Sequence, residues 1–417
     1  MTTLPAALDR IPTGGRIIAG ACCGGPTSLL RGVAERSTGR GWLLWTGLLL
    51  DDGGVYDAAR AGDLSLATWH VAGAGRQLLE DGLLDFAPVR ASRLERCISA
   101  WDLDAALVRV SPPDANGWCS LGPSVAYART AIEAAKLCIA EVDEALPRTH
   151  GASMVHVSDL DVLVPSTTET PRYRSARPDE LSRAIARNVL TLLPDRPVLQ
   201  LGIGTVTEAL VSALLDERVD GLRFVGMGMD AMADLFEHGL LARTPPGAAA
   251  IESPDLLGTD RMMRFAHENP VVGVYPSTIA HAPQLLARHD RLVSVNSAVE
   301  VDLSGQVNSE VAGGRQLAGI GGSIDFVEAA SQAAEGVRII ALPSTTRNGE
   351  RSRIVPRLAA DVTVTIPRGM VDFVVTEHGV AQLEGRTLGE RAEALIDVAA
   401  PEHRTELVDA MRKVAPR

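Results

Sequence analysis

Short apolar runs separated by amphipathic stretches fill the chain before Pro165. The apolar runs are residues 16–20, 42–50, 106–112, 138–142 and 154–164. Between them, residues 26–37 and 124–136 repeat apolar side chains every three or four positions, which is the helical period. Continuous apolar runs favour strands that are buried on both faces, and intervening helices favour parallel connections. The pattern therefore predicts an α/β domain with a largely parallel sheet.

This alternation is interrupted between Pro165 and Pro178, where the sequence PSTTETPRYRSARP is polar, rich in proline and without periodicity. Such a segment is typical of a linker or an exposed crossover. A chain of 417 residues is also too long for one ordinary core, since single domains stop growing at about 250–300 residues. We therefore predict two α/β domains, 1–175 and 176–417. The second begins with a helix whose apolar stripe contains Leu181, Ile185 and Val189.

The second half repeats a layout that is already present near the start. RPVLQLGIGTVTEALVSALLDE reads as a strand, a glycine turn and a helix, in the same order as RIIAGACCGGPTSLLRGVAE. This likeness suggests that the halves are duplicated copies of one α/β unit, although a strand, a glycine turn and a helix are a common combination. Helices close the chain after a further series of predicted strands. Those strands are residues 271–276, 291–307, 338–346, 362–367 and 371–379.

Composition and charge restrict the classes of function that the chain can have. With 46% hydrophobic and 22% charged residues, the chain is typical of a soluble globular protein. A net charge of −12 and a pI near 5.3 disfavour nucleic acid, which requires a basic surface. Lys136 and Lys413 are the two lysines of the sequence. A bound phosphate or carboxylate would therefore be held by arginine or by backbone N–H groups.

Cysteine usage and the absence of targeting segments predict a cytoplasmic protein. The five cysteines show no C-x-x-C spacing and no accompanying histidine cluster, so we expect neither a disulfide framework nor a metal site. The first residues lack the pattern of a signal peptide, and no apolar stretch is long enough to span a membrane. Cys22 and Cys23 precede a proline-started helix, where the pKa of a thiol can be lowered, although buried packing is the commoner fate of cysteine.

Two glycine-rich turns are candidate binding elements. In LGIGT (201–205), Gly202 and Gly204 follow a predicted strand and open a helix, where N–H groups converge on an anion or a developing oxyanion. The segment fails as a dinucleotide fingerprint because Thr207 stands where a third glycine belongs, and a tight packed turn is the alternative.

The second turn carries three glycines. In LAGIGGSIDF (317–326), Gly319, Gly321 and Gly322 precede Ser323, which we expect to cap the following helix. Glycines at this place remove the side chains that would keep a ligand away from the backbone. We expect a binding role, with a structural turn as the alternative.

Charged residues offer further candidates. Arg351 and Arg353 follow an Asn-Gly turn, where they could hold a phosphate or form an ordinary solvated turn. Glu300 and Asp302 alternate with valine on a predicted strand and so point to one side, as a carboxylate pair or as a wet face. The histidines fall in no triad spacing, and a serine hydrolase is therefore improbable.

Many separate segments together resemble one known family. They are DANGWCSLGPS (114–124), MVHVSDLD (154–161), VLQLGIGTV (198–206), ENPVVGVYP (268–276), LVSVNSAVEVDLSGQV (292–307), GIGGSIDF (319–326), ALPSTT (341–346), RSRIVP (351–356) and VDFVVTEHGVAQLEGRTLGERAEALI (371–396). In this order they resemble the acetyl-CoA hydrolase/transferase family, and in particular the 4-hydroxybutyrate and related acyl-CoA:carboxylate CoA-transferases.

The resemblance implies a tandem pair of CoA-transferase-type (NagB/RpiA-like) α/β domains with mainly parallel sheets. It implies acyl-CoA bound between them, mostly by the second domain, with no metal and with a homodimer as the usual assembly. In such enzymes a loop glutamate attacks the thioester, forms an acyl-glutamyl anhydride and then a glutamyl-CoA thioester. The glycine-rich turn of the second domain and the GIGGS segment would cradle CoA and the reacting carbonyl.

The sequence departs from this family at the attacking residue. Matching Asp220 and Glu237–Gly239 to the family pattern without a gap puts Gly226 at the position of the glutamate. A carboxylate nucleophile is what makes the covalent route possible, and its loss is expected to slow that route by many orders of magnitude. We therefore expect an acyl-CoA enzyme that works by direct acyl transfer or hydrolysis.

The remaining assignments follow from this expectation. Backbone donors at Gly202–Gly204 and Gly321–Gly322 would stabilise the oxyanion. Glu300 or Glu377 would act as the general base. The alternatives are a conventional CoA-transferase that uses another carboxylate, and a non-catalytic protein that binds CoA or a partner subunit.

Overall fold

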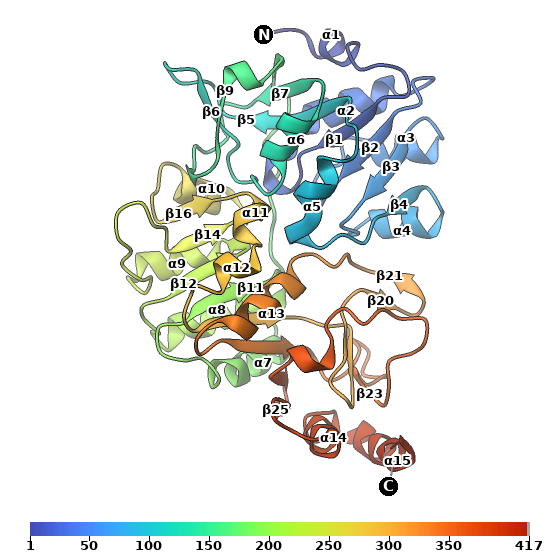
Figure 1. Ribbon diagram of the computed structural model, residues 1–417, viewed down its shortest axis with the longest axis vertical. Helices are drawn as coiled ribbons and strands as arrows, with labels where there is room; N and C mark the ends of the chain where they lie inside the picture. The colour runs from blue at the N-terminus through green and yellow to red at the C-terminus, as the bar shows by residue number, and fades with distance from the viewer. Residues whose placement is uncertain (415–417) are drawn as a thin grey trace. The chain divides into compact units, whose positions relative to one another are not determined.

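The computed structural model describes residues 1–414, and within them the chain forms two compact units (Figure 1). Unit 1 contains Met1–Arg174, Gly226–Ala233 and Arg243–Ala282. Unit 2 contains Ser175–Val225, Asp234–Ala242 and Pro283–Arg417, of which the structure describes the part up to residue 414. No helix within residues 1–414 combines the length and the apolar character needed to cross a membrane.

Unit 1 is built on a sheet of seven parallel strands in the order β10-β7-β5-β1-β2-β3-β4. Strand β5 is buried along its whole length, and all but one residue of each of its neighbours β1 and β7 is buried, because most of their side chains are apolar on both faces. The strands are β1 (Arg16–Ala19), β2 (Leu43–Thr46), β3 (Ser65–Thr68), β4 (Leu84–Phe86), β5 (Ala105–Val110), β7 (Cys138–Val142) and β10 (Val162–Pro165).

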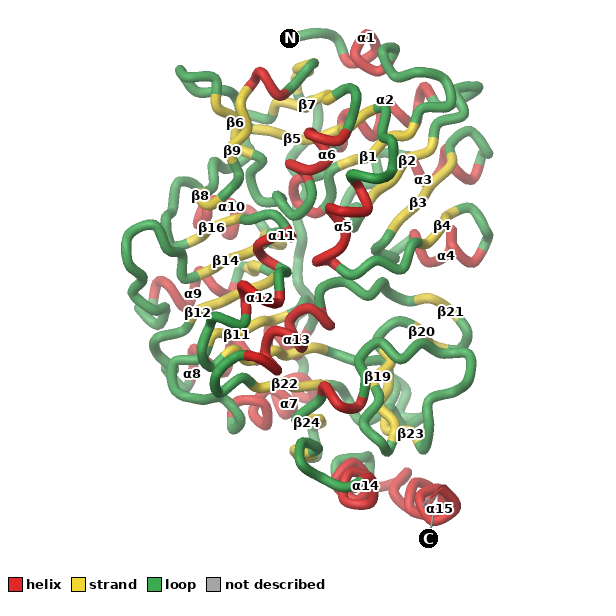
Figure 2. The backbone as a smooth tube through the Cα atoms, viewed as in Figure 1, coloured by secondary structure: helices red, strands yellow, loops and turns green. Residues whose placement is uncertain are grey.

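Helices cover this sheet, and Figure 2 shows them alternating with its strands. The helices are α1 (Leu4–Leu8), α2 (Thr27–Arg36), α3 (Val55–Arg60), α4 (Gly75–Glu80), α5 (Ala91–Ile98) and α6 (Ala128–Ala134). Short elements complete this part of the chain: η1 (Cys22–Gly24), β6 (Trp118–Ser120), β8 (His150–Gly151), β9 (Met154–His156) and η2 (Val157–Asp159). The buried core of unit 1 includes Ile17, Leu29, Trp42 and Leu107.

Later segments of the chain also belong to unit 1. They are β13 (Gly228–Met229), β14 (Ile251–Ser253), β15 (Leu256–Leu257), α10 (Asp260–Ala266), β16 (Val272–Val274) and α11 (Ser277–Ala280). Strand β16 pairs in parallel with both β14 and β8, and β13 pairs with β15. The carboxylate of Asp230 accepts hydrogen bonds from the backbone N–H groups of Thr259 and Met262, which fixes the start of α10. Helix α9 (Ala231–Glu237) belongs partly to each unit.

Unit 2 contains neighbouring strands in the order β25-β24-β22-β17-β11-β12. From β11 to β24 the pairing is parallel, and β25 joins antiparallel at the edge. The strands are β11 (Val198–Leu201), β12 (Arg223–Gly226), β17 (Leu292–Asn296), β22 (Val337–Ala341), β24 (Phe373–Thr376) and β25 (Gly379–Gln382). The helices are α7 (Glu180–Leu190), α8 (Thr205–Asp216), α12 (Pro283–Leu286), α13 (Ser323–Gln332), α14 (Leu388–Asp397) and α15 (Arg404–Val414).

Small strands and 3-10 turns extend from the sheet of unit 2. They are β18 (Glu300–Asp302), β19 (Val307–Asn308), β20 (Val311–Ala312), β21 (Arg315–Gln316), β23 (Ile354–Val355), η3 (Arg368–Met370) and η4 (Pro401–His403). Strand β18 pairs with both β19 and β23, so this excursion has its own small sheet. A second core cluster, which includes Val301, Ile354 and Leu395, lies beneath it.

The two units share one strand order. In unit 1, β1 lies between β2, which follows it in the chain, and the series β5, β7, β10. In unit 2, β11 lies between β12, which follows it, and the series β17, β22, β24. The likeness between the two strand, turn and helix segments in the sequence therefore extends to their place in the two sheets.

Three predicted strands differ in the structure. Residues 154–164 form β9, the turn η2 and β10, because the His156 and Asp159 side chains close a capping box around η2. Residues 291–307 split into β17 and β18, because the chain leaves the parallel sheet after Asn296 and pairs with β19. Residues 362–367 form no strand and contribute one isolated bridge, from Ile366 to Val307.

The first helix of unit 2 buries its predicted stripe except at its start. Leu181 is exposed, whereas Ser182, Ile185 and Val189 are buried. The carboxylate of Asp179 accepts a hydrogen bond from the backbone N–H of Ser182 at 2.8 Å, and this cap turns Ser182 inward.

Candidate functional site

The carboxyl edge of the sheet in unit 2 contains a point where the chain reverses its direction of progress. From β11 the chain passes to β12 on one side, whereas β17, β22 and β24 follow one another on the other side. In open α/β sheets such a switch point leaves a crevice outside the carboxyl ends of the two central strands, and ligands bind there. The boundary between β11 and β17 is therefore the place to look for a site in unit 2.

The turn that follows β11 at this switch point is open. Gly202 and Gly204 have no atom within 4 Å of the position that a Cβ would occupy, and the side chain of Ile203 is 40% exposed. Gly204 has a φ of +143°, in the region that side-chain-bearing residues rarely adopt. Gly204 is also the N-cap of α8, and no side chain caps that helix. The first N–H groups of α8 are therefore available to a ligand.

The GIGGS segment forms a second glycine turn of this kind. Gly321 has a φ of +59° and empty space where a Cβ would lie. Gly322 is the N-cap of α13, and again no side chain caps the helix. The prediction that Ser323 would cap this helix is wrong, because Ser323 is its first residue and its hydroxyl donates to the carbonyl of Ile320 at 3.1 Å. With Gly319 these residues lie partly exposed at the start of α13.

Both uncapped helix starts face the same edge of the sheet. Helix α8 begins directly after the carboxyl end of β11. Helix α13 packs on β17 and β22 and ends just before β22 begins, so its own start lies toward the carboxyl ends of the strands. Each start carries a partial positive charge from the helix dipole. Unit 2 therefore has two helix starts without side-chain caps at the carboxyl edge of its sheet.

A buried amide network lies beneath this edge. The Oε1 atom of Gln200 on β11 accepts from the hydroxyl of Ser294 at 2.8 Å and from Nδ2 of Asn296 at 3.2 Å. Nδ2 of Asn296 also donates to Ser294 Oγ at 2.8 Å. All three side chains are at most 8% exposed. This group was not predicted from the sequence, although polar residues inside the otherwise apolar strands VLQL and LVSVN were its signal.

A glutamate stands at the end of a neighbouring strand. Glu377 follows β24, and its two carboxylate oxygens accept from the backbone N–H and the hydroxyl of Ser344, at 2.9 and 2.5 Å. The imidazole Nε2 of His378 lies 3.6 Å from Oε1 of Glu377. Ser344 follows β22, so these groups also lie at the carboxyl edge. Glu377 is thus a carboxylate held in place from two sides.

The predicted arginines lie on the loop that joins this edge to β23. The backbone N–H of Arg353 donates to the carbonyl of Ser344 at 2.8 Å. Burial lowers the pKa of Arg353, and the nearby carboxylate of Glu377 acts in the opposite direction. Arg351 is exposed, and its backbone N–H donates to the hydroxyl of Thr346 at 3.2 Å. The structure thus brings Arg353 near Glu377 and leaves Arg351 at the surface.

Glu300 and Asp302 have separate partners. The Nδ2 atom of Asn308 donates to Oε1 of Glu300 at 3.0 Å, and Glu300 keeps partial exposure. Asp302 is 2% exposed, and its carboxylate accepts from Ser304 and Gln306, which closes the turn between β18 and β19. The interpretation of the two as a carboxylate pair is wrong, because the carboxylate of Asp302 is used by the turn.

Gly226 ends β12 and is counted with unit 1. It is buried, and its φ of +93° lies in the region that favours glycine. Gly228 follows two residues later, and its N–H donates to Ser253 Oγ at 3.0 Å. A Cβ at Gly228 would lie 2.5 Å from Cδ2 of Leu256. Gly226 and Gly228 thus flank the single residue between β12 and β13, and the positive φ of Gly226 favours glycine there.

The structure does not show a lowered pKa for the thiols of Cys22 and Cys23. Burial raises the pKa of Cys22 well above its ordinary value, and the nearby Asp255 and Cys23 raise it further. Burial also raises the pKa of Cys23 to about 11. Both thiols are therefore buried packing residues, which was the alternative considered from the sequence. Within residues 1–414, no three His, Cys, Asp or Glu side chains gather in a way that could hold a metal ion.

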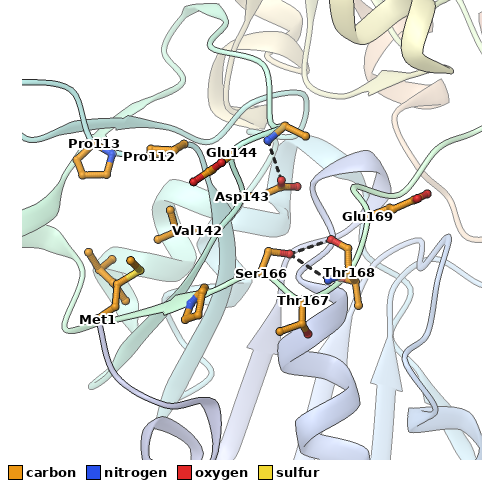
Figure 3. Close-up of a pocket in the computed structure, with 13 residues that line it drawn as sticks. Met1, Pro112, Pro113, Val142, Asp143, Glu144, Ser166, Thr167, Thr168 and Glu169 are labelled. Carbon is orange, nitrogen blue, oxygen red and sulfur yellow. Dashed lines mark hydrogen bonds between the residues drawn. The ribbon is translucent and has the colours of Figure 1, made fainter.

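Two cavities lie away from the glycine turns, and one of them borders Asp302. One in unit 1 encloses about 660 Å³ between Pro112, Glu144 and the segment Ser166–Glu169 (Figure 3). It borders Asp143, whose Oδ2 is paired with the buried guanidinium of Arg109. The other, in unit 2, encloses about 720 Å³ beside Arg368 and the start of α14. Neither is lined by the glycine turns.

Comparison with known proteins agrees with this architecture. The family model described as "Acetyl-CoA hydrolase/transferase N-terminal domain" matches residues 65–171, and "Acetyl-CoA hydrolase/transferase C-terminal domain" matches residues 258–411. A 4-hydroxybutyrate coenzyme A transferase from Clostridium kluyveri is 37% identical over 349 residues, which are 82% of this chain and 81% of the relative. An acetyl-CoA hydrolase from Eremothecium gossypii is 28% identical over 74% of this chain and 65% of its own.

Solved structures give the same result for the fold. The crystal structure of RipA from Yersinia pestis has a TM-score of 0.91 and 27% sequence identity, and the match covers 99% of this chain and 97% of that one. A 4-hydroxybutyrate CoA-transferase from Porphyromonas gingivalis has a TM-score of 0.80 and 27% identity, with the same coverage. The resemblance inferred from the sequence motifs is confirmed by these matches. The chain belongs to the acetyl-CoA hydrolase/transferase family of enzymes.

Proposed function

We propose that this enzyme acts on an acyl-CoA thioester by direct attack of water, or of the hydroxyl or amine of an acceptor, on the acyl carbon. The route would not pass through a glutamyl intermediate. Gly226 would stand where the family carries its attacking glutamate. Coenzyme A would bind as part of the substrate at the carboxyl edge of the sheet in unit 2, and no metal would take part.

The conformation of Gly226 is the observation that carries this proposal. A residue with a side chain at a φ of +93° is strained, at a cost of about 1–3 kcal/mol. The backbone at residue 226 therefore favours glycine, and a glutamate in the same conformation would be strained. This conformation supports the assignment of Gly226 to the position of the family glutamate.

The retained groups of unit 2 support a reaction at the thioester carbonyl. The uncapped N–H groups at the starts of α8 and α13 would stabilise the negative charge that develops on the carbonyl oxygen. Arg351 and Arg353 would contact the phosphates of CoA. Both carboxylate oxygens of Glu377 accept from Ser344, whereas Asn308 donates to one oxygen of Glu300, so of the two glutamates considered, Glu300 is the freer one to act as a base.

The position of Glu377 supports one alternative, conventional CoA transfer. A carboxylate held at the carboxyl edge of the sheet could itself attack the thioester, and its displacement from Ser344 would then be required. We also propose, from the sequence, that the chain divides at residues 175 and 176 and works as a cytoplasmic homodimer. Neither a nucleic acid nor a membrane is expected as a partner.

The test compares thiol release with the formation of an adduct. The enzyme is incubated with acetyl-, butyryl- and succinyl-CoA, free thiol is followed over time, and the intact protein is weighed by mass spectrometry. We expect thiol release without a protein-bound acyl or CoA group. An adduct on a carboxylate would establish the conventional route instead, and binding of CoA without turnover would establish a binding protein.

Two variants sharpen this test. Gly226→Glu restores the family residue type at a strained position, and we expect no adduct from it. Glu377→Gln removes the competing carboxylate and is expected to leave adduct-free thiol release in place. If Glu377→Gln abolishes an adduct that the unaltered enzyme forms, the direct route is excluded.

A further inference from the structure

The cavity of about 720 Å³ in unit 2 is separate from the glycine turns. One wall is formed by the turn between β18 and β19, by the segment that follows β23 and by η3. The other is formed by the start of α14 and the end of α15, two helices that pack against each other (Figure 1). Every residue that lines the cavity belongs to unit 2. Its volume lies in the range of about 300–1,000 Å³ that is usual for small-molecule pockets.

A buried guanidinium joins three of the segments around this cavity. Arg391 lies on α14 and is 9% exposed. Its Nη1 donates to the carbonyl of Ser304 at 3.2 Å and to the carbonyl of Arg368 at 2.7 Å. A Cβ at Gly305, which has a φ of +93°, would lie 3.1 Å from this Nη1, so the turn and the helix approach closely. The walls are therefore held in place by the fold, and the cavity is preformed.

The carboxylate at the base of the cavity is already used by the protein. Asp302 is the one acidic side chain among the described residues that line the cavity, and it is 2% exposed. Its Oδ1 accepts from the hydroxyl of Ser304 at 2.6 Å, and its Oδ2 accepts from Nε2 of Gln306 at 3.1 Å. These hydrogen bonds close the turn between β18 and β19. Asp302 is therefore engaged within the turn.

Two arginines that line the cavity are unpaired. Arg357 and Arg368 are both exposed, and within residues 1–414 neither guanidinium forms a hydrogen bond or an ion pair. Arg391, which lies behind the wall, has carbonyl partners and no carboxylate partner among the same residues. Guanidinium groups bind carboxylates and phosphates with two parallel hydrogen bonds. The charged groups in and behind this cavity therefore favour an anion.

The helical side of the cavity is apolar. Leu388, the first residue of α14, is 54% exposed, and Leu358 and Met411 line the same space with partial exposure. Gly389 also lines it and has no atom within 4 Å of the position that a Cβ would occupy. A single exposed leucine is ordinary on a protein surface. Grouped around a cavity, these side chains offer a surface for an apolar chain or ring.

The start of α14 does not compete with the arginines for an anion. The hydroxyl of Thr387 accepts from the N–H of Glu390, and the carboxylate of Glu390 accepts from the N–H of Thr387. This capping box occupies the helix start and places a negative charge there. An anionic group is therefore expected on the other wall, at Arg357 and Arg368.

We propose that this cavity is a second ligand site of the chain and that it binds a small amphipathic anion. The apolar chain or ring of the ligand lies against Leu388 and Met411, and its carboxylate or phosphate head binds the guanidinium groups of Arg357 and Arg368. The site is separate from the glycine turns, and it does not depend on the proposed function.

The test measures binding to the full-length chain by calorimetry. The probes are octanoate and octyl phosphate, which share one apolar chain and differ in the head, together with octan-1-ol, inorganic phosphate and butanoate. We expect at least one of the two octyl anions to bind, and neither octan-1-ol nor inorganic phosphate to bind measurably. The stronger of the two anions identifies the head. Each methylene that leaves water contributes about a fourfold gain in affinity, so butanoate is expected to bind about 200-fold more weakly than octanoate.

Substitutions separate the two walls. Arg357→Gln and Arg368→Gln are each expected to lower the affinity for the octyl anion by about 10-fold. Gly389→Leu puts a side chain into open space on the apolar wall and should also weaken binding. Leucine is a stronger helix former than glycine, so the helix is expected to persist. The control is Arg412→Gln on α15, because Arg412 is exposed, is paired with Asp409 and does not line the cavity. It should leave affinity unchanged.

A crystal structure with 8-bromooctanoate locates the ligand through the anomalous signal of bromine. Bromine in this cavity would support the site, and bromine found only elsewhere would exclude it. Gly204→Ala, at the turn that follows β11, is expected to leave octanoate binding unchanged. A loss of octanoate binding in Gly204→Ala with none in the arginine variants would place the probe at the glycine turns instead.

The remaining outcomes are equally specific. If octan-1-ol binds as tightly as the octyl anions, the anionic head is excluded. If Arg357→Gln, Arg368→Gln and Gly389→Leu all bind as the unaltered chain does, or if the folded chain binds none of the probes, the site is excluded. Thermal unfolding of each variant checks that it is folded. None of these results depends on thiol release from acyl-CoA, so the proposed function is tested separately.

Discussion

The two units place the same strand, turn and helix at the same switch point, yet one turn is filled and the other is open. After β1 in unit 1, the turn is buried from Gly20 to Gly25, and the Tyr127 hydroxyl donates to the carbonyl of Ala19 just before it. After β11 in unit 2, Gly202 and Gly204 have no neighbours where a Cβ would lie. A local motif of this kind therefore leaves room for a ligand only where the rest of the fold does not cover it.

The polar groups beneath the two switch points also differ: they are charged in unit 1 and neutral in unit 2. In unit 1, the guanidinium of Arg109 on β5 is fully buried between Glu141 and Asp143 of the neighbouring chain segment, at 2.7 Å from each. In unit 2, neutral amides of Gln200 and Asn296 take the corresponding region. Buried charges are tolerated in unit 1 because each has an oppositely charged partner. The neutral amides of unit 2 keep the open edge polar without the cost of burying a charge.

The largest effect is expected from breaking the ion network of unit 1. Glu141→Ala leaves Arg109 with Asp143 as its remaining carboxylate partner and removes the acceptor of Ser28 and Ser166, so we expect a loss of about 3–5 kcal/mol in the free energy of unfolding. Urea denaturation measures it. Gln200→Ala in unit 2 is the matched case, with an expected loss of about 1–3 kcal/mol. Equal losses would remove this distinction between the units.

Asp255, which lies between β14 and β15 and interacts with Cys22 of the covered turn, should make the stability of unit 1 depend on pH. Its pKa in the folded chain, about 7, lies above the ordinary 3.8, so the folded state binds this proton more tightly. The stability that this provides is fully present below pH 4 and is lost as the pH rises through 7. Asp255→Asn does not titrate, so its stability does not fall with pH in this way. We expect it to gain up to about 4 kcal/mol relative to the unaltered chain between these limits, and less to the extent that water reaches the group.

This prediction is checked by the difference in free energy of unfolding between the two proteins at several pH values. A difference that is constant from pH 4 to pH 8 would mean that Asp255 titrates normally. In that case the cover over the turn of unit 1 would not exclude water from the carboxyl group.

Substitution in the open turn of unit 2 should change the affinity for acyl-CoA. Gly204→Ala strains a residue with a φ of +143° and moves the N–H groups at the start of α8, so we expect acyl-CoA affinity to fall by about 10- to 100-fold. Calorimetry measures this affinity. Gly62→Ala in unit 1 is the control, because Gly62 also has a positive φ, +80°, and empty space around it. Equal affinities for the two variants would contradict a binding role for the turn.

The smallest effect concerns a capped helix in unit 2. The Thr387 hydroxyl accepts from the N–H of Glu390, and the Glu390 carboxylate accepts from the N–H of Thr387, so α14 has the capping box that α8 and α13 lack. Thr387→Ala should cost about 1 kcal/mol of stability and leave acyl-CoA affinity unchanged. A loss of affinity as large as that of Gly204→Ala would show that capping does not separate structural from binding helices here.

Much of the fold could be predicted from periodicity because the strands of parallel sheets are apolar on both faces. The runs at 16–20 and 138–142 became β1 and β7 with little change. Predictions failed where a polar side chain competed with the periodic pattern. His156 closed a turn inside one predicted strand, and the cap of Asp179 turned Ser182 inward in place of Leu181. Such contacts depend on a single side chain and not on the period.

Some residues of the candidate site could be predicted from local sequence patterns, and others could not. The glycine turns could be identified from the sequence because glycine between a strand and a helix permits backbone conformations and close approaches that other residues do not. Gln200 and Asn296 were missed because their partners are 94 to 96 residues apart in the chain. The raised pKa of Asp255 was missed for the same reason, since its neighbours Ser124, Cys22 and Gly228 come from distant segments.

Local patterns of residue types were enough to identify the family, the α/β alternation and the glycine at residue 226, because each can be read from neighbouring positions in the chain. Which glycine turn is covered, which carboxylates have partners and how strongly Asp255 holds its proton became visible in the folded chain alone. These properties depend on the neighbours that long-range packing supplies and on the water that it removes.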